Sequence, residues 1–155
     1  MKRAVFFLLI MAFNARAGGF CFNAAGNKYH IDPLLLRAIA EVESGLNPSA
    51  INLNKHHGKI ISIDYGVMQI NSTHLPELQS MGITRDRLLQ NPCLNIQVGA
   101  WILARQLAYG GVRWDSVGAY NAGFALHGQT ARLKYSRTVY QHYKSLLLAE
   151  RGIRL

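Results

Sequence analysis

Two carboxylates of this chain stand in sequence contexts that differ in the way acid–base chemistry requires. Glu43 comes near the end of an apolar helical pattern, where partial burial is expected to raise the pKa of a carboxyl group. Asp64 stands in a short extended segment rich in polar groups. A desolvated carboxylic acid beside a solvent-exposed, ionised carboxylate is the arrangement that cleaves glycosidic bonds. Glu43 is therefore the candidate general acid and Asp64 the candidate second carboxylate.

The helix that must carry Glu43 has signals at both ends. Asp32 is the expected N-cap, Pro33 occupies the first helical position, and Gly45 ends the helix. At about 100° per residue, one apolar stripe is predicted to contain Leu35, Ala38, Ile39 and Val42.

Glu41 is the rival of Glu43 on the same helix. Arg37 and Glu41 are expected to form an exposed i,i+4 pair opposite the apolar stripe. Glu43 falls at the edge of the stripe, near Leu36, where its carboxyl would be partly desolvated. The helix therefore favours Glu43 as the catalytic residue.

Three ordered motifs extend this interpretation: Glu43-Ser44-Gly45, Gly66-Val67-Met68-Gln69 and Ala119-Tyr120-Asn121. They resemble the motifs of the lytic transglycosylases, within the lysozyme-like superfamily. Asp64-Tyr65-Gly66 followed by Gln69-Ile70-Asn71-Ser72 also resembles the strand that carries the catalytic aspartate of animal lysozymes. With its short length and export signal, the chain looks most like the IagB and IpgF group, which accompanies type III secretion and pilus systems. The resemblance implies an α+β, mainly α, lysozyme-like fold with a small β-hairpin beside the active-site groove.

The resemblance also implies a reaction and a set of roles. Glu43 would protonate the oxygen that links N-acetylmuramic acid to N-acetylglucosamine in a β-1,4 bond. It would then take the proton of the muramyl C6 hydroxyl, giving a 1,6-anhydro product. The substrate-binding residues implied are Ser44, Met68, Gln69, Tyr120 and Asn121.

Each of these residues has an expected task. Met68 and Gln69 would line the sugar subsites, with the Gln69 amide donating to an N-acetyl carbonyl and accepting from a hydroxyl. Tyr120 would hydrogen-bond the catalytic carboxyl, and Asn121 would contact the substrate. Ser44 would orient either the Glu43 carboxyl or the part of the substrate on the leaving-group side of the bond. Ordinary core positions for Met68 and Tyr120 remain open as the alternative.

Asp64 departs from the pattern of many lytic transglycosylases, which have no second catalytic carboxylate. Its presence keeps open a hydrolytic muramidase that uses Glu43, Asp64 and water. A solvent-facing aspartate without a role is the simplest alternative for this residue. A third possibility for the whole chain is a non-catalytic peptidoglycan-binding assembly factor.

The N-terminus has the features of a signal peptide. Lys2 and Arg3 precede an apolar run over residues 4–13, and Ala15-Arg16-Ala17 supplies a cleavage site. We expect residues 1–17 to be removed on export to the periplasm, leaving one lysozyme-like domain over residues 18–155. An uncleaved anchor is the alternative, although the apolar run is about half the length that spans a bilayer.

The mature chain is predicted to stay basic. Removing residues 1–17 takes away three cations and no acid, so the formal charge falls from +9 to +6. Export and the absence of a basic run or nucleic-acid-binding motif argue against nucleic acid as partner. Peptidoglycan, which carries peptide carboxylates, fits both the charge and the compartment. We expect a monomer, with components of a secretion or pilus apparatus as possible further partners.

The two cysteines, Cys21 and Cys93, are expected to form a disulfide between the first short helix and the start of the central helix. The histidines show no metal-ligand spacing, because His56 and His57 are adjacent and no His-x3-His pair exists. No metal and no cofactor is therefore predicted.

Helices dominate the remaining pattern. They are expected over residues 20–29, 73–81, 84–89, 93–109, 114–120 and 130–150, with Thr84 and Asn91 as N-caps. A hairpin is predicted from residues 60–63 and 65–70, and no other strand is expected.

Overall fold

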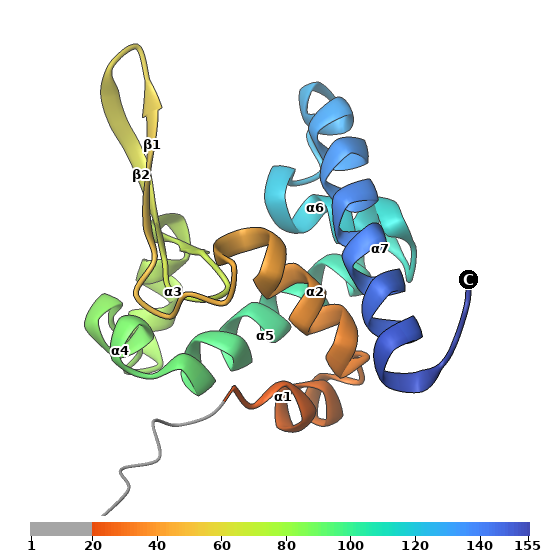
Figure 1. Cartoon of the computed structure of the whole chain (residues 1–155). Coiled ribbons are helices and arrows are strands. Elements are labelled where there is room, and N and C mark those ends of the chain that lie inside the picture. Colours follow the sequence, from red (N-terminus) through yellow and green to blue (C-terminus); the bar gives the residue numbers. More distant parts are fainter. Residues whose placement is uncertain (1–19) are drawn as a thin grey trace, which may run out of the picture.

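The structure is a computed structural model that describes residues 20–155, and within that range it is mainly helical (Figure 1). The helices are α1 (Phe22–Tyr29), α2 (Pro33–Ser44), α3 (Leu75–Ser80), α4 (Arg85–Gln90), α5 (Pro92–Gly110), α6 (Trp114–Ala122) and α7 (Gln129–Arg151). Short 3-10 turns cover Ser72–His74 and Leu126–Gly128. The strands are β1 (Ile51–His56), β2 (Lys59–Tyr65) and β3 (Ile70–Asn71). The predicted α+β, mainly α, fold is confirmed.

The helix starts predicted from the sequence are confirmed by their capping hydrogen bonds. The Asp32 carboxylate accepts from the backbone N–H of Leu34 at 2.9 Å, and Pro33 begins α2. Thr84 caps α4, and Asn91 caps α5. Each cap satisfies a backbone donor that has no partner inside the helix.

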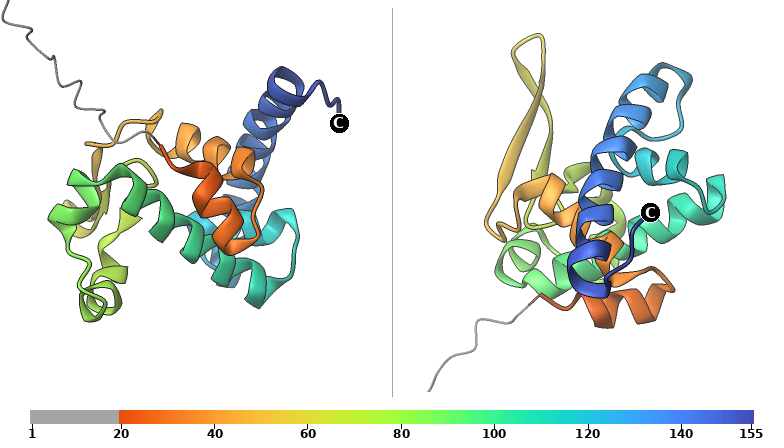
Figure 2. Two further views of the ribbon diagram at one scale, coloured as in Figure 1. Left: turned by 90° about the horizontal axis from the view of Figure 1, so that it is seen from below. Right: turned by 45° about the vertical axis from the view of Figure 1, so that its right-hand side comes forward.

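The core lies around α2 and α5. Helix α5 runs from the side of α4 to the side of α6, and α7 packs along α2 and α6 (Figures 1 and 2). The largest fully buried side chains come from several of these elements: Leu36, Ile39, Met68, Ile70, Leu78, Leu88, Ile96 and Leu103. This packing fixes the end of α2, where Glu43 lies, against α7.

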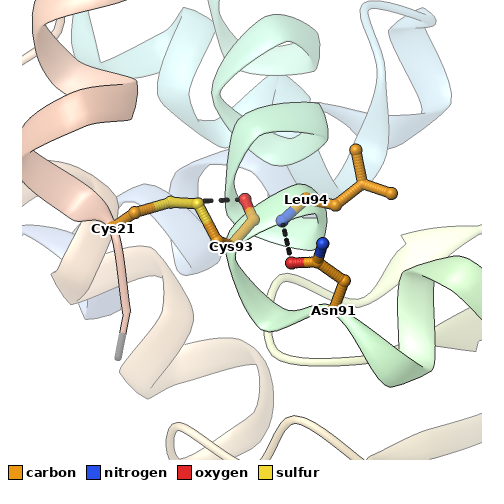
Figure 3. The surroundings of a disulfide bond; sticks show 4 residues. All are labelled: Cys21, Asn91, Cys93 and Leu94. Carbon is orange, nitrogen blue, oxygen red and sulfur yellow. Dashed lines mark hydrogen bonds between the residues drawn. A yellow bond between two sulfur atoms is a disulfide. The ribbon is translucent and has the colours of Figure 1, made fainter. Parts of the chain in front are cut away.

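The predicted disulfide between Cys21 and Cys93 is present, with a Cα–Cα distance of 5.2 Å (Figure 3). It joins the start of α1 to the first turn of α5, beside the Asn91 cap on Leu94. The sequence separation of 72 residues corresponds to a stabilisation of about 4 kcal/mol in the chain-entropy model. The bridge therefore anchors the N-terminal helix to the central one.

The sheet differs from the predicted hairpin. Its order is β1-β2-β3, all antiparallel, and the long hairpin is formed by β1 and β2. Strand β1 was not predicted, because its asparagines are poor strand formers. Residues 66–69 form a turn and not a strand, since both Gly66 and Gln69 have positive φ, 76° and 50°.

The β1–β2 hairpin projects from the helical body, as Figure 1 shows. Its two-residue loop is His57-Gly58, with φ of 48° and 77°. Positive φ at both positions is the requirement of a type I′ turn, whose twist matches that of the flanking strands. The hairpin stands opposite the α6–α7 connection, which rises on the other side of α2 (Figures 1 and 2).

Among the residues described, no helix is both long and apolar enough to cross a bilayer. The predicted signal peptide, residues 1–17, lies outside the described range.

Candidate active site

Glu43 lies in the last turn of α2, where it continues the most buried face of that helix. Three residues of this face are fully buried: Leu36, Ile39 and Ala40. Leu35 and Val42, predicted to belong to the apolar stripe, are only partly buried. The buried face is thus turned toward Leu36, and the Glu43 side chain, itself partly buried, leaves it toward a groove.

A tyrosine that the sequence analysis did not identify holds the Glu43 carboxyl. The Tyr135 hydroxyl, from α7, donates a hydrogen bond of 2.5 Å to Oε1 of Glu43. Burial raises the pKa of Glu43 to about 7, the Tyr135 hydrogen bond opposes this rise, and the negative charge of Asp64 adds to it. Near neutral pH the group therefore exchanges a proton readily, as a residue that acts first as acid and then as base must.

Asp64 is surrounded by asparagine side chains. Nδ2 of Asn54 and of Asn52 donate to its Oδ2 at 2.8 and 3.2 Å. Nδ2 of Asn71 donates to Oδ1 at 2.6 Å. An ionised carboxylate only accepts hydrogen bonds, so this set of donors matches the charged form of Asp64. The sheet register explains the arrangement, because Asp64 lies directly opposite Asn52 on β1 and Asn71 on β3.

Glu43 and Asp64 also differ from the other carboxylates in their pairing with cations. All eight acidic residues lie within residues 20–155. Six of them have a cation within 4 Å: Asp32, Glu41, Glu77, Asp86, Asp115 and Glu150. In the described part of the chain, Glu43 and Asp64 have none. Both carboxyl groups are held by neutral groups instead, so no cation of the described residues competes with a substrate for them.

The two carboxylates line one groove of about 550 Å³ between the β1–β2 hairpin and α6. The hairpin and β3 contribute Asn54, Ile61, Ser62, Asp64 and Asn71, and the helical side contributes Glu43, Gln106, Ala119, Tyr120, Asn121 and Gly123. Gln69, Thr73 and His74 complete the lining. A groove lined by amides and hydroxyls around two acids suits a polar, uncharged ligand such as a sugar chain.

The structure places Tyr120 and Met68 differently from the sequence prediction. The Tyr120 hydroxyl donates to the backbone carbonyl of Met68 at 2.8 Å and not to Glu43. The Met68 side chain is fully buried and does not line the groove. It packs against Gly99, where an added Cβ would lie 2.7 Å from Met68 Cε. Met68 thus fixes the turn and Tyr120 to each other, while Tyr120 itself faces the groove.

Gln69 lines the groove as predicted, but its amide is oriented by the protein. Its Nε2 donates to the backbone carbonyls of Gly66 and Ala50, at 2.8 and 3.3 Å. The two amide hydrogens are therefore engaged, and Oε1 is left as an acceptor. Gln69 therefore does not have the free N–H that donation to an N-acetyl carbonyl would need. Its Oε1 can instead accept a hydrogen bond from a ligand hydroxyl or N–H.

Ser44 connects the end of α2 to the same turn. Its hydroxyl donates to the Val67 carbonyl at 2.8 Å and accepts from the Asn47 N–H at 3.1 Å. Ser44 does not line the groove. Its contact positions the residue before it, Glu43, relative to the turn over residues 66–69.

Asn95 is a second residue that the sequence analysis did not identify, and its side chain holds the turn over residues 66–69. Asn95, buried in α5, accepts from the Met68 N–H at 2.8 Å and donates to the carbonyls of Tyr65 and Leu88. A Cβ added at Gly66 would lie 2.2 Å from Asn95 Nδ2, so glycine is required there. The position of a polar residue on the buried face of the central helix was the sequence signal for this role, because a buried polar side chain needs hydrogen-bond partners.

Asn121 is exposed at the groove and makes no side-chain hydrogen bond within residues 20–155. Its amide is therefore available to a ligand, and its contact with substrate, expected from the third motif, stays a prediction. The asparagines around Asp64 were not predicted. Asn52 and Asn54 alternate with apolar residues, and Asn71 follows Ile70, but this pattern does not indicate what the amides contact.

No group of three or more His, Cys, Asp or Glu side chains in the described residues is placed to hold a metal ion.

Comparison with known proteins places this geometry in a family. The transglycosylase SLT domain model matches residues 20–142. The chain is 45% identical over 133 residues to a peptidoglycan-binding-like protein of Escherichia coli O157:H7, covering 84% of this chain and 80% of that one. It is 42% identical to protein IpgF of Shigella flexneri, covering 92% and 91% of the two chains. It is 40% identical to invasion protein IagB of Salmonella typhimurium strain SL1344, covering 81% and 76%. The chain therefore belongs to the transglycosylase SLT domain family, within the lysozyme-like superfamily.

Proposed function

We propose that this protein is a peptidoglycan lytic transglycosylase that cleaves the β-1,4 bond between N-acetylmuramic acid and N-acetylglucosamine. The observation that carries the proposal is that two acidic residues in different environments line the same groove. Glu43 is shielded, with a pKa of about 7, and Asp64 is held by three amides. Family membership and the name of the peptidoglycan-binding-like relative support peptidoglycan as the substrate.

In the proposed first step, protonated Glu43 gives its proton to the linking oxygen as the bond from that oxygen to the muramyl C1 breaks. The N-acetylglucosamine hydroxyl leaves, and C1 acquires oxocarbenium character. In the second step, the muramyl C6 oxygen attacks C1 while its proton passes to the Glu43 carboxylate. The acid is thereby restored, the 1,6-anhydro ring closes, and no water is consumed.

Three residues support Glu43 in this scheme. Tyr135 holds the carboxyl from α7, while Ser44 and Tyr120 fix the turn over residues 66–69 to the end of α2 and to α6. Asp64 supplies negative charge across the groove from the helical side, where it stabilises the positive charge that develops on the sugar. Gln69 and Asn121 contact the glycan strand.

Asp64 also supports a second candidate, a hydrolytic muramidase. A second carboxyl group in the same groove is what an oxocarbenium intermediate captured by water would need. The two reactions differ only in which oxygen attacks C1. A third candidate is a protein that binds glycan in the groove without cutting it, which fits the printed name of one relative.

The cellular setting forms part of the proposal. We infer that residues 1–17 direct export, that the mature domain acts as a monomer in the periplasm, and that it opens the wall locally for an envelope-spanning apparatus. The likeness to proteins IpgF and IagB, the latter named an invasion protein, favours a secretion apparatus.

Digestion of purified sacculi, followed by mass spectrometry of the soluble fragments, tests the proposal. Fragments that end in 1,6-anhydro-muramic acid are expected. Reducing-end muropeptides, heavier by one water, would identify the muramidase. Binding to sacculi without release of fragments would identify the non-catalytic protein.

A further inference from the structure

The register of the β1–β2 hairpin determines which of its lysine and histidine side chains face the groove. Asn54 lines the groove, and its side chain shares a face with that of His56, two residues further along β1. Lys59 lies directly opposite His56 on β2 and therefore on the same face. His56 and Lys59 thus continue the groove face toward the tip of the hairpin.

An irregularity between Asn54 and Lys55 supports this assignment. It leaves Ile61 as an extra residue on β2, and both Ile61 and Ser62 line the groove. Two consecutive residues on one face are what a β-bulge produces. Counting back from Ile61, Lys59 returns to the groove face, whereas Ile60 and its partner Lys55 lie on the outer face.

The lysine charge at this end of the groove has no acidic partner among residues 20–155. Residues 51–63 contain two lysines, two histidines and no acid. Lys59 is exposed and takes part in no ion pair within residues 20–155, where six of the eight acids are paired elsewhere.

Arg105 gives the opposite case, in a neighbouring pocket that shares His74 and Gln106 with the groove. Its guanidinium is paired with Glu77 at 2.8 Å and stacks over Trp101 at 4.7 Å. The charge of Arg105 is therefore paired with Glu77, whereas that of Lys59 is available to a ligand.

We propose that His56 and Lys59 form a carboxylate-binding subsite that takes the stem peptides of peptidoglycan while the glycan strand occupies the groove. The inference rests on the proposed substrate and adds a preference for strands that carry their peptides. Lys59 precedes Asp64 by five residues, which places it roughly 15 Å away along the strand. The subsite therefore acts on binding at a distance from the bond that is cut.

The test compares Lys59→Gln with Lys55→Gln, which makes the same charge change on the outer face of the same hairpin. Binding to soluble peptidoglycan strands is measured in a Glu43→Gln background, which prevents cleavage. The same measurement is made on strands stripped of their peptides by an amidase, which leaves only the lactyl carboxylate on each muramic acid, close to the sugar ring. Lys59→Gln is expected to weaken binding to peptide-bearing strands about two- to fivefold, the size of an exposed ion pair. No difference from the parent is expected with stripped strands, and Lys55→Gln should bind like the parent.

Equal effects of the two substitutions, or equal losses on stripped and peptide-bearing strands, would overturn the subsite. Vesicles containing phosphatidylglycerol provide a second arm. If Lys59→Gln lost binding to vesicles but not to strands, the hairpin would face lipid and the inference would be wrong. Because binding is read without turnover, failure of this subsite is distinguishable from failure of wild-type protein to cleave sacculi.

Discussion

The hydroxyl of Tyr135 donates a hydrogen bond to the carboxyl of Glu43, although 92 residues separate them. The bond joins the second turn of α7 to the last turn of α2, two helices that pack along each other. The C-terminal helix thereby fixes the direction in which the candidate acid faces the groove.

Replacement of Tyr135 by Phe should change the pH profile as well as the rate. The hydrogen bond lowers the pKa of Glu43, so its loss should move the alkaline limb of kcat/KM upward by up to about one pH unit. The rate should fall because the carboxyl loses its orientation. Tyr143→Phe is the matched control, since that hydroxyl of α7 donates to Asp32, outside the groove lining. A lower rate with an unmoved limb would show that Tyr135 acts only through packing.

The raised pKa of Glu43 also predicts how stability depends on pH. The folded protein binds this proton more tightly than the unfolded chain, with pKa values of about 7 and 4.5. The folded state is therefore favoured at low pH, and its stability falls as pH rises from 4.5 through 7. The effect has an upper limit of about 3 kcal/mol, reduced because Glu43 is partly exposed.

Glu43→Gln should remove this dependence. In urea unfolding, the stability of the variant relative to wild type should increase between pH 5 and pH 8. Parallel pH curves for the two proteins would mean that Glu43 titrates normally in the folded state.

Asp64→Asn should lower the rate of wall cleavage about ten- to a hundredfold, because it removes a negative charge facing the developing oxocarbenium ion. The amide remains close in shape, and binding of glycan should persist. Asp86→Asn provides the control, since that exposed residue lies on α4 and is paired with Arg85. Unchanged cleavage by Asp64→Asn in sacculus digests would return Asp64 to a structural role on the hairpin.

The parts of the fold that could be predicted from sequence are those with local signals. Asp32, Thr84 and Asn91 precede their helices with side chains that cap them. The disulfide followed from having two cysteines in a chain that we predicted to be exported. The partly buried position of Glu43 on α2 followed from its place in the helical pattern.

The parts that could not be predicted depend on packing between distant segments. Tyr135 lies in a helix with two other tyrosines, and only the contact of α7 with α2 distinguishes it. The alternation of asparagine with apolar residues in β1 has low strand propensity, and its pairing with β2 decides its structure. Met68 resembled a subsite residue in sequence, but the space beside Gly99 holds it in the core.

The central claim is that Glu43 is the acid that cuts the glycan strand. The most direct measurement compares Glu43→Gln and Glu41→Gln in the release of soluble fragments from sacculi. The two residues share α2, but Glu41 is paired with Arg37 and His142. Glu43→Gln should lose about 10² to 10⁴-fold in rate while still binding sacculi, because the amide cannot deliver a proton. Glu41→Gln should cleave at nearly the wild-type rate. Equal activities of the two variants, or substantial cleavage by Glu43→Gln, would contradict the account.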